Sequence, residues 1–128
     1  MEYNPVGWFE IYVQDMARAT AFYEAIFQWQ MTPMGNPDPE GFPGMEMCSF
    51  PSSMTAYGAS GALVKMPNTP SGGSTLVYFS CEDCAVILAR VIAHGGTVVS
   101  DKMSIGEHGF IAIFSDTEGN VIGLHSQN

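Results

Sequence analysis

Hydrophobic and polar side chains alternate between residues 6 and 13, which predicts a β-strand with two different faces. One face carries three apolar side chains, Phe9, Ile11 and Val13. The opposite face carries Trp8, Glu10 and Tyr12. The first face has the composition of a core that packs under a helix. The second face is large and amphipathic, and we expect it to form the wall of a cavity.

A helical pattern follows, in which apolar positions recur at intervals of three and four residues. Asp15 is the expected N-cap, and the helix is expected to run to about Phe27. Its apolar stripe consists of Ala19, Phe22, Tyr23 and Ile26. Residues 36–44 are rich in Pro and Gly and predict a loop. Weaker strand patterns cover residues 45–50, 53–57 and 62–66.

The same order of elements begins again after a plausible linker at residues 67–73. A strand is predicted at 75–81, followed by a helix that begins at Asp83 and stops at Gly95. The apolar positions of this helix are Ile87, Leu88, Val91 and Ile92. The rest of the chain predicts a short strand at 97–99 and two stronger strands, at 110–115 and 120–126, joined by a turn.

The two matching helix caps indicate an internal repeat. Asp83 follows Asp15 by 68 residues, and the same offset aligns Glu10 with Tyr78. Each half then reads as a strand, a helix and about three strands, a unit that buries one sheet face under its helix. We therefore predict a single α+β domain over residues 1–128. It would contain two βαβββ modules, at about 5–66 and 74–126, that form a partly open curved sheet around a pocket with the helices outside.

Composition and charge narrow the range of partners. The chain has 128 residues, the size of one domain, of which 46% are hydrophobic and 13% charged. A net charge of −9, with only four Lys and Arg, argues against binding to nucleic acid or to an anionic membrane surface. No apolar run approaches the roughly 18 residues of a transmembrane helix. The first five residues do not have the pattern of a signal peptide, so we expect a cytoplasmic protein with reduced cysteines.

Two motifs resemble those of a known superfamily, and together they cover nearly the whole chain. The first lies within residues 9–27 and contains Asp15, Ala19, Phe22 and Tyr23. The second lies within residues 109–126 and carries Asp116, Gly119 and Asn120 in its turn. Both are typical of the vicinal oxygen chelate superfamily, which includes glyoxalase I, extradiol dioxygenases and the bleomycin- and fosfomycin-resistance proteins. Residues 8–11, 104–112 and 122–126 are more closely similar to a bacterial group of predicted enzymes related to lactoylglutathione lyase.

The resemblance also implies where a metal ion would bind in this superfamily. The expected ligand positions fall on Trp8, Leu76 and Gly123, and on a fourth position between Ala62 and Val64. Divalent metals in such sites need carboxylate or imidazole ligands, which none of these residues supplies. The resemblance thus implies a chain without the superfamily's metal centre. We expect no cofactor, and metal-dependent glyoxalase or dioxygenase activity is disfavoured.

Three polar residues remain on the faces that we expect to line the pocket. Glu10 and His125 each lie two residues beyond a lost ligand position, and Tyr78 occupies the repeat-related place of Glu10. In this superfamily the first and last strands of a module are parallel neighbours, which implies that Tyr78 lies next to His125. A Glu, a Tyr and a His that meet in one pocket are suited to acid–base chemistry. We therefore take these three as candidate catalytic residues.

Other interpretations of the same residues remain open. Glu10 and His125 also suit a closed polar network without turnover, or a displaced metal site that recruits Glu107 or His108. Glu107 and His108 precede the strand at 110–115, where loops of the superfamily overhang the pocket. His108 is accordingly either a lid residue that touches the ligand or a loop residue bound to local backbone.

The two cysteines at 81 and 84 form a C-x-x-C pattern at the junction of a predicted strand and helix. A helix N-terminus can lower the pKa of a thiol, which is the basis of a redox role. Cys81, however, falls on the apolar face of its strand, which favours a place in the core.

These observations leave two classes of function. The first is a metal-independent module that binds a small organic molecule in a pocket with Trp8, Tyr12, Glu107 and His108. The second is an enzyme of the lyase or isomerase type, with Glu10, Tyr78 and His125 as its acid–base groups or with relocated metal ligands. We expect a homodimer, because the aromatic and Met-rich faces are larger than a chain of this size exposes alone.

Overall fold

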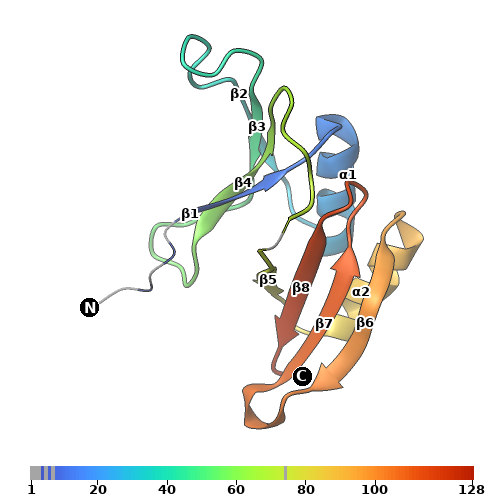
Figure 1. Ribbon diagram of the computed structural model, residues 1–128. Helices are drawn as coiled ribbons and strands as arrows, with labels where there is room; N and C mark the ends of the chain where they lie inside the picture. The colour runs from blue at the N-terminus through green and yellow to red at the C-terminus, as the bar shows by residue number, and fades with distance from the viewer. Residues whose placement is uncertain (1–3, 5, 7, 74) are drawn as a thin grey trace.

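The computed structural model describes residues 4, 6, 8–73 and 75–128, and it confirms an α+β fold of two βαβββ modules (Figure 1). The predicted module starts at residues 5 and 74 lie outside the described residues. The first module contains β1 (Trp8–Tyr12), α1 (Met16–Phe27), β2 (Thr32–Gly35), β3 (Glu46–Ser49) and β4 (Ser60–Lys65). The second contains β5 (Val77–Ser80), α2 (Cys84–Ala93), β6 (Thr97–Ser104), a 3₁₀ turn η1 (Gly106–His108), β7 (Phe110–Ser115) and β8 (Val121–Ser126).

Each module forms its own four-stranded sheet. The strand orders are β1-β4-β3-β2 and β5-β8-β7-β6, so the two sheets have the same topology. In each sheet the first and last strands of the module are parallel neighbours, as the resemblance implied. Glu10 lies opposite Ala62 in the β1/β4 pair, and Tyr78 lies opposite Gly123 in the β5/β8 pair. The repeat that aligns Glu10 with Tyr78 therefore holds in three dimensions.

Both helices begin where the sequence predicts. The side chain of Asp15 accepts a hydrogen bond from the backbone N–H of Arg18, and that of Asp83 accepts one from Ala85. The predicted apolar stripe of α1 is buried, and α2 buries Ile87, Leu88 and Val91. Ile92, also predicted to face the core, is 65% exposed. Gly95 follows the end of α2 with a φ of +95°, a conformation that glycine adopts without strain.

One hydrophobic core runs beneath both modules. It includes the buried faces of α1 and α2, which are in contact, and apolar side chains from both sheets. Phe79 of β5 lies 5.8 Å from Phe9 of β1 and 5.3 Å from Phe50, measured between ring centroids. Phe9 immediately precedes Glu10 in the chain, and Phe79 immediately follows Tyr78. The two strands that carry these candidate residues thus approach one another on the helix side of the sheets.

Two features of the first module differ from the sequence prediction. Residues 53–57 form turns and bends rather than a strand. Met54 and Tyr57 there are almost fully exposed, so no neighbouring strand or core holds the segment extended. β2 has no hydrophobic pattern and was not predicted. It is an exposed edge strand that contains Pro33, a residue that edge strands tolerate.

β6 is longer than predicted, since it continues to Ser104 instead of ending at residue 99. Its pairing with β7 shifts register twice, between Val98 and Ser100 and between Ser100 and Met103. Exposure alternates along β6 through residue 103, but Ser100, Asp101 and Lys102 supply no apolar side chain that would mark the continuing strand in the sequence.

Candidate ligand-binding face

Trp8, Glu10 and Tyr12 form a hydrogen-bonded group on the outer face of β1, which we call the β1 triad. The indole Nε1–H of Trp8 donates to Oε2 of Glu10 at 3.1 Å. The hydroxyl of Tyr12 donates to the other oxygen, Oε1, at 2.9 Å. Glu10 is exposed and Trp8 is 44% exposed, whereas Ile11 between Glu10 and Tyr12 is buried. The predicted division of the strand into a core face and an amphipathic face is therefore confirmed.

Glu10 changes the pKa of Tyr12, to which it is hydrogen-bonded. The hydrogen bond to Glu10, followed by partial burial and the charge of Glu10, raises the pKa of the Tyr12 phenol above its ordinary value. The ion pairs of the described residues join Arg18 to Glu118, Lys102 to Asp83 and His108 to Glu107. Within the described chain, Glu10 therefore has neutral donors as partners and no basic group.

Tyr78 lies on the corresponding face of β5. Its ring covers the backbone of Gly123, because a Cβ atom added at Gly123 would overlap the ring carbons of Tyr78. The tyrosine is nevertheless 45% exposed. Gly123 thus provides the space for an aromatic side chain that rests on β8 and presents its other surface to solvent.

His125 is half-buried on β8 and is held by the loop that precedes β7. Its Nε2 lies 2.7 Å from the carbonyl oxygen of His108. Because a carbonyl can only accept, Nε2 must carry the proton, and Nδ1 of the neutral ring is left as an acceptor. The residue directly opposite His125 on β5 is Ser80, so Tyr78 is a diagonal neighbour and not the paired one.

The three candidate catalytic residues do not form one hydrogen-bonded cluster. Glu10 lies on the first sheet with Trp8 and Tyr12 as its partners, while Tyr78 and His125 lie on the second sheet. Glu107 and His108 lie in η1. Their side chains are exposed, and Nε2 of His108 lies 3.8 Å from Oε1 of Glu107. His108 contacts the candidate site through its backbone oxygen, which lies beside His125, while its own side chain lies at the surface near Glu107. Neither the lid interpretation nor the local-backbone interpretation of the His108 side chain is therefore decided.

Two shallow hollows lie elsewhere on the surface, at about 360 and 340 Å³. The first lies between α1, β2 and β3, and the second lies at the start of α2. Cys81 lines the second hollow, and burial raises the pKa of its thiol to about 12, with Cys84 as the next contribution. A thiol with such a pKa is not a reactive nucleophile at neutral pH, which agrees with the structural interpretation of Cys81.

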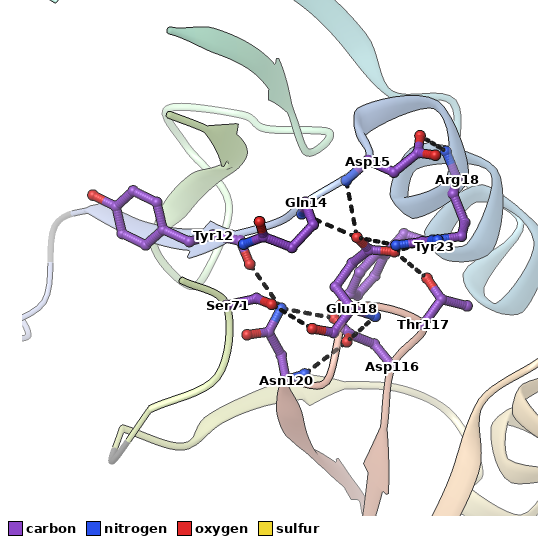
Figure 2. A network of polar contacts seen from close by, with 10 residues as sticks. All are labelled: Tyr12, Gln14, Asp15, Arg18, Tyr23, Ser71, Asp116, Thr117, Glu118 and Asn120. Carbon is purple, nitrogen blue, oxygen red and sulfur yellow. Dashed lines mark hydrogen bonds and ion pairs between the residues drawn. The ribbon is translucent and has the colours of Figure 1, made fainter. Parts of the chain in front are cut away.

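The turn between β7 and β8 holds a buried polar network that sequence reasoning missed (Figure 2). Asp116 accepts hydrogen bonds from the Tyr23 hydroxyl at 2.9 Å and from the backbone N–H groups of Glu118 and Asn120. The amide of Asn120 in turn donates to the backbone oxygen of Tyr12. Polar residues in a turn usually face solvent, so the pattern alone does not reveal burial. The motif match on Asp116 and Asn120 is the one signal that could have done so.

This network also holds the segment between the modules. Ser71 donates to the backbone oxygen of Glu118, and the side chain of Gln14 donates to the backbone oxygen of Thr69. The predicted linker at 67–73 therefore contacts the first module through the backbone of Thr69 and the second module through the side chain of Ser71. It is fixed to both modules and is not a free tether.

A family model described as the Glyoxalase/Bleomycin resistance protein/Dioxygenase superfamily matches residues 6–124. The chain belongs to this superfamily. It is 28% identical over 119 residues to a glyoxylase-like domain-containing protein of Didymella fabae, across 92% of this chain and 90% of the relative. It is 26% identical to the anthracycline biosynthesis protein DnrV of Streptomyces peucetius, across 88% of this chain but only 43% of that relative. The chain is also similar to the crystal structure of TnmS3, an antibiotic binding protein from Streptomyces sp. CB03234, with 26% sequence identity and a TM-score of 0.67. The match covers 100% of this chain and 99% of the TnmS3 chain.

The residues of this chain do not fit the metal centre that the superfamily implies. Because Glu10 and Tyr78 are repeat equivalents, Ala62 opposite Glu10 is the equivalent of Gly123 opposite Tyr78. This register places the fourth ligand position at Ala62, which has no ligand atom. At Gly123 the ring of Tyr78 fills the space that a longer side chain would need. Among the described residues, no three His, Cys, Asp or Glu side chains gather to hold a metal elsewhere.

Proposed function

We propose that this chain binds a small organic molecule against the β1 triad and the exposed ring of Tyr78, without a metal ion. The observation that carries the proposal is the pair of hydrogen bonds that holds Trp8 and Tyr12 on Glu10 at an exposed surface. Exposed hydrogen bonds add little to stability. Aromatic side chains that are already oriented lose little conformational freedom when a ligand binds.

The relatives support a binding role more than a defined reaction. TnmS3 is described as antibiotic binding, and its likeness extends over the whole chain. DnrV is described as a protein of anthracycline biosynthesis, although this chain spans less than half of its length. Both descriptions name organic molecules, an antibiotic and an anthracycline, and so support an organic ligand for the open face described above.

Calorimetric titration with a panel of polycyclic organic molecules, including an anthracycline, tests this proposal. Trp8→Ala and Tyr78→Ala should each weaken binding by about 10-fold, since an aromatic contact contributes roughly 1–1.5 kcal/mol. Tyr57→Ala is the matched control, because Tyr57 is a still more accessible tyrosine, 91% exposed, in the loop before β4 and away from the β1 triad. Equal affinity in all three variants, or no binding across the panel, would contradict the proposal.

A second function is favoured by the geometry of His125. The carbonyl of His108 fixes the tautomer of the histidine and leaves Nδ1 free to accept a proton. With Tyr78 as a diagonal neighbour on the same face, this pair suits the acid–base step of a metal-independent lyase or isomerase. If turnover occurs, His125→Asn should lower kcat far more than it changes KM, whereas a binding module should show no turnover at all.

We also propose that the chain works as a homodimer in the cytoplasm. The two sheets expose four large hydrophobic side chains, and this exposure supports a second copy that packs beside the ligand-binding face. They are Trp8, Tyr78, Met103 and Val121. Light scattering of the purified protein measures the oligomeric state directly.

For the described residues, no helix is long and apolar enough to cross a membrane.

A further inference from the structure

The β1 triad combines an uncompensated negative charge with two aromatic rings. Trp8 and Tyr12 are neutral donors, so their hydrogen bonds orient the carboxylate of Glu10 without neutralising it. Each carboxylate oxygen has room for about two hydrogen bonds and here receives one from the triad. Both oxygens of Glu10 therefore keep acceptor capacity toward solvent.

Three of the four basic residues have partners away from Glu10. Arg18 pairs with Glu118, and Lys102 pairs with Asp83. Arg90 donates to the backbone oxygen of Ile26. Lys65, the last of the four basic residues, follows Val64 on β4, and Val64 rather than Lys65 lies opposite Tyr12. Among the described residues, none of these basic side chains forms an ion pair with Glu10, so its charge is available to a ligand.

We propose that the ligand of this face is an organic cation whose charge lies beside Glu10, between the rings of Trp8 and Tyr12. This inference rests on the proposed binding function and adds the chemical class of the ligand. Aromatic faces attract ammonium groups within about 6 Å of the ring centroid. Alternate residues of a strand are roughly 6.5 Å apart at the backbone. The hydrogen bonds from Trp8 and Tyr12 draw both side chains toward the carboxylate of Glu10, so a cation beside that carboxylate meets both aromatic groups.

The carboxylate and the rings act on different parts of such a ligand. Glu10 attracts the charge, and any N–H group on the cation can donate to its free acceptor positions. The indole and the phenol cover the alkyl groups that surround the charge and replace part of its lost hydration. A small hydrated metal ion has no such apolar surface, which distinguishes this site from a metal centre.

The experiment compares choline with its uncharged carbon isostere, 3,3-dimethylbutan-1-ol, in NMR titrations of the full chain. The indole N–H signal of Trp8 is the readout, because that group is bonded to Glu10. The Trp29→Phe variant identifies the signal, since Trp8 and Trp29 are the two tryptophans of the chain. Sodium chloride at the same concentrations controls for ionic strength.

We expect choline to bind about 10-fold more tightly than the isostere, and Glu10→Gln to reduce this difference to about 2-fold or less. Glu40→Gln is the matched control, because it removes the same charge from an exposed loop residue and should preserve the preference. Equal affinities for the two probes in the wild-type chain would overturn the inference without any variant. So would a choline preference that survives in Glu10→Gln, or no saturable shift with choline up to about 0.1 M.

These outcomes are separable from those of the proposed function. If polycyclic molecules bind, and Trp8→Ala and Tyr78→Ala weaken them, but choline binds no more tightly than its isostere, the binding function holds while the cation inference fails. If neither the panel nor choline binds, both fail together.

Discussion

Arg18 and Glu118 form a two-point ion pair between residues 100 positions apart. Nε of Arg18 lies 2.6 Å from Oε2 of Glu118, and Nη2 lies 2.9 Å from Oε1. The carboxylate, whose side chain is fully buried, also accepts from the backbone N–H groups of Gln14 and Asp15. One side chain of the second module thus holds the first turn of α1 in the first module (Figure 2).

Removing the charge of Glu118 should destabilise the whole chain. Glu118→Gln leaves donors of Arg18, Gln14 and Asp15 with a weaker or mismatched partner, and we expect a loss of about 2–4 kcal/mol in the free energy of unfolding. Urea denaturation measures it. Glu107→Gln, which affects only an 89% exposed side chain, should change stability by less than about 0.5 kcal/mol. Equal stabilities of the two variants would show that the pair does not join the modules.

The same carboxylate predicts how stability depends on acid. Burial alone would raise the pKa of Glu118, but hydrogen bonds from Arg18, Thr117 and the backbone lower it to about 2. The unfolded value is near 4.3, so the stabilisation is complete above about pH 5 and is lost as the pH falls toward 2. Wild-type stability should therefore decrease over this window more steeply than that of Glu118→Gln. Parallel curves from urea titrations at several pH values would contradict the assignment.

Tyr23 tests the buried half of the network. Its hydroxyl donates to Asp116 at 2.9 Å, and burial, followed by the charge of Asp116, raises the pKa of the phenol well above its ordinary value. Tyr23→Phe keeps the ring and removes one of several donors to Asp116, so we expect a loss of about 1–2 kcal/mol. In the double variant with Glu118→Gln the losses should not add, because both residues belong to one network. Strict additivity would argue for two independent contacts.

The proposed ligand contacts should behave differently from this network. Glu10→Gln and His125→Asn alter hydrogen bonds at exposed or half-buried positions, so each should leave the free energy of unfolding within about 1 kcal/mol of the wild type. Ligand binding should nevertheless be weakened. Thermal and urea denaturation decide the matter. If both variants lose more than about 2 kcal/mol, these residues are structural and the ligand assignment is withdrawn.

Cys81 should be inert toward thiol reagents. Its pKa of about 12 leaves very little thiolate at neutral pH, and its Sγ lies against the backbone oxygen of His125. We expect labelling of the native chain at pH 7 to be slow and to become fast for all three cysteines after unfolding. Cys81→Ser identifies which signal belongs to this residue. Rapid native labelling that disappears in Cys81→Ser would restore the redox interpretation of the C-x-x-C pattern.

Local chemistry was sufficient to predict most elements of this fold. Asp15 and Asp83 cap helices through their own side chains, and the alternation around Glu10 assigns neighbouring residues to opposite faces. These effects act over a few residues, so they are written into short stretches of sequence. The spacing of Asp15 and Asp83 also revealed the duplication. Where local signals were weak or broken, as in the Pro-containing edge strand β2 and the bulged strand β6, the prediction failed.

Relations between distant residues were decided by the tertiary structure. The sequence identified Glu10, Tyr78 and His125, but the packing of the two sheets assigned them different partners: the β1 triad, the surface of Gly123 and the backbone of His108. Likewise, a polar turn around Glu118 became the buried connection between the modules. The free energy of a buried charge depends on which donors surround it, and all the donors to the Glu118 carboxylate except Thr117 come from residues 14–18, about a hundred positions away.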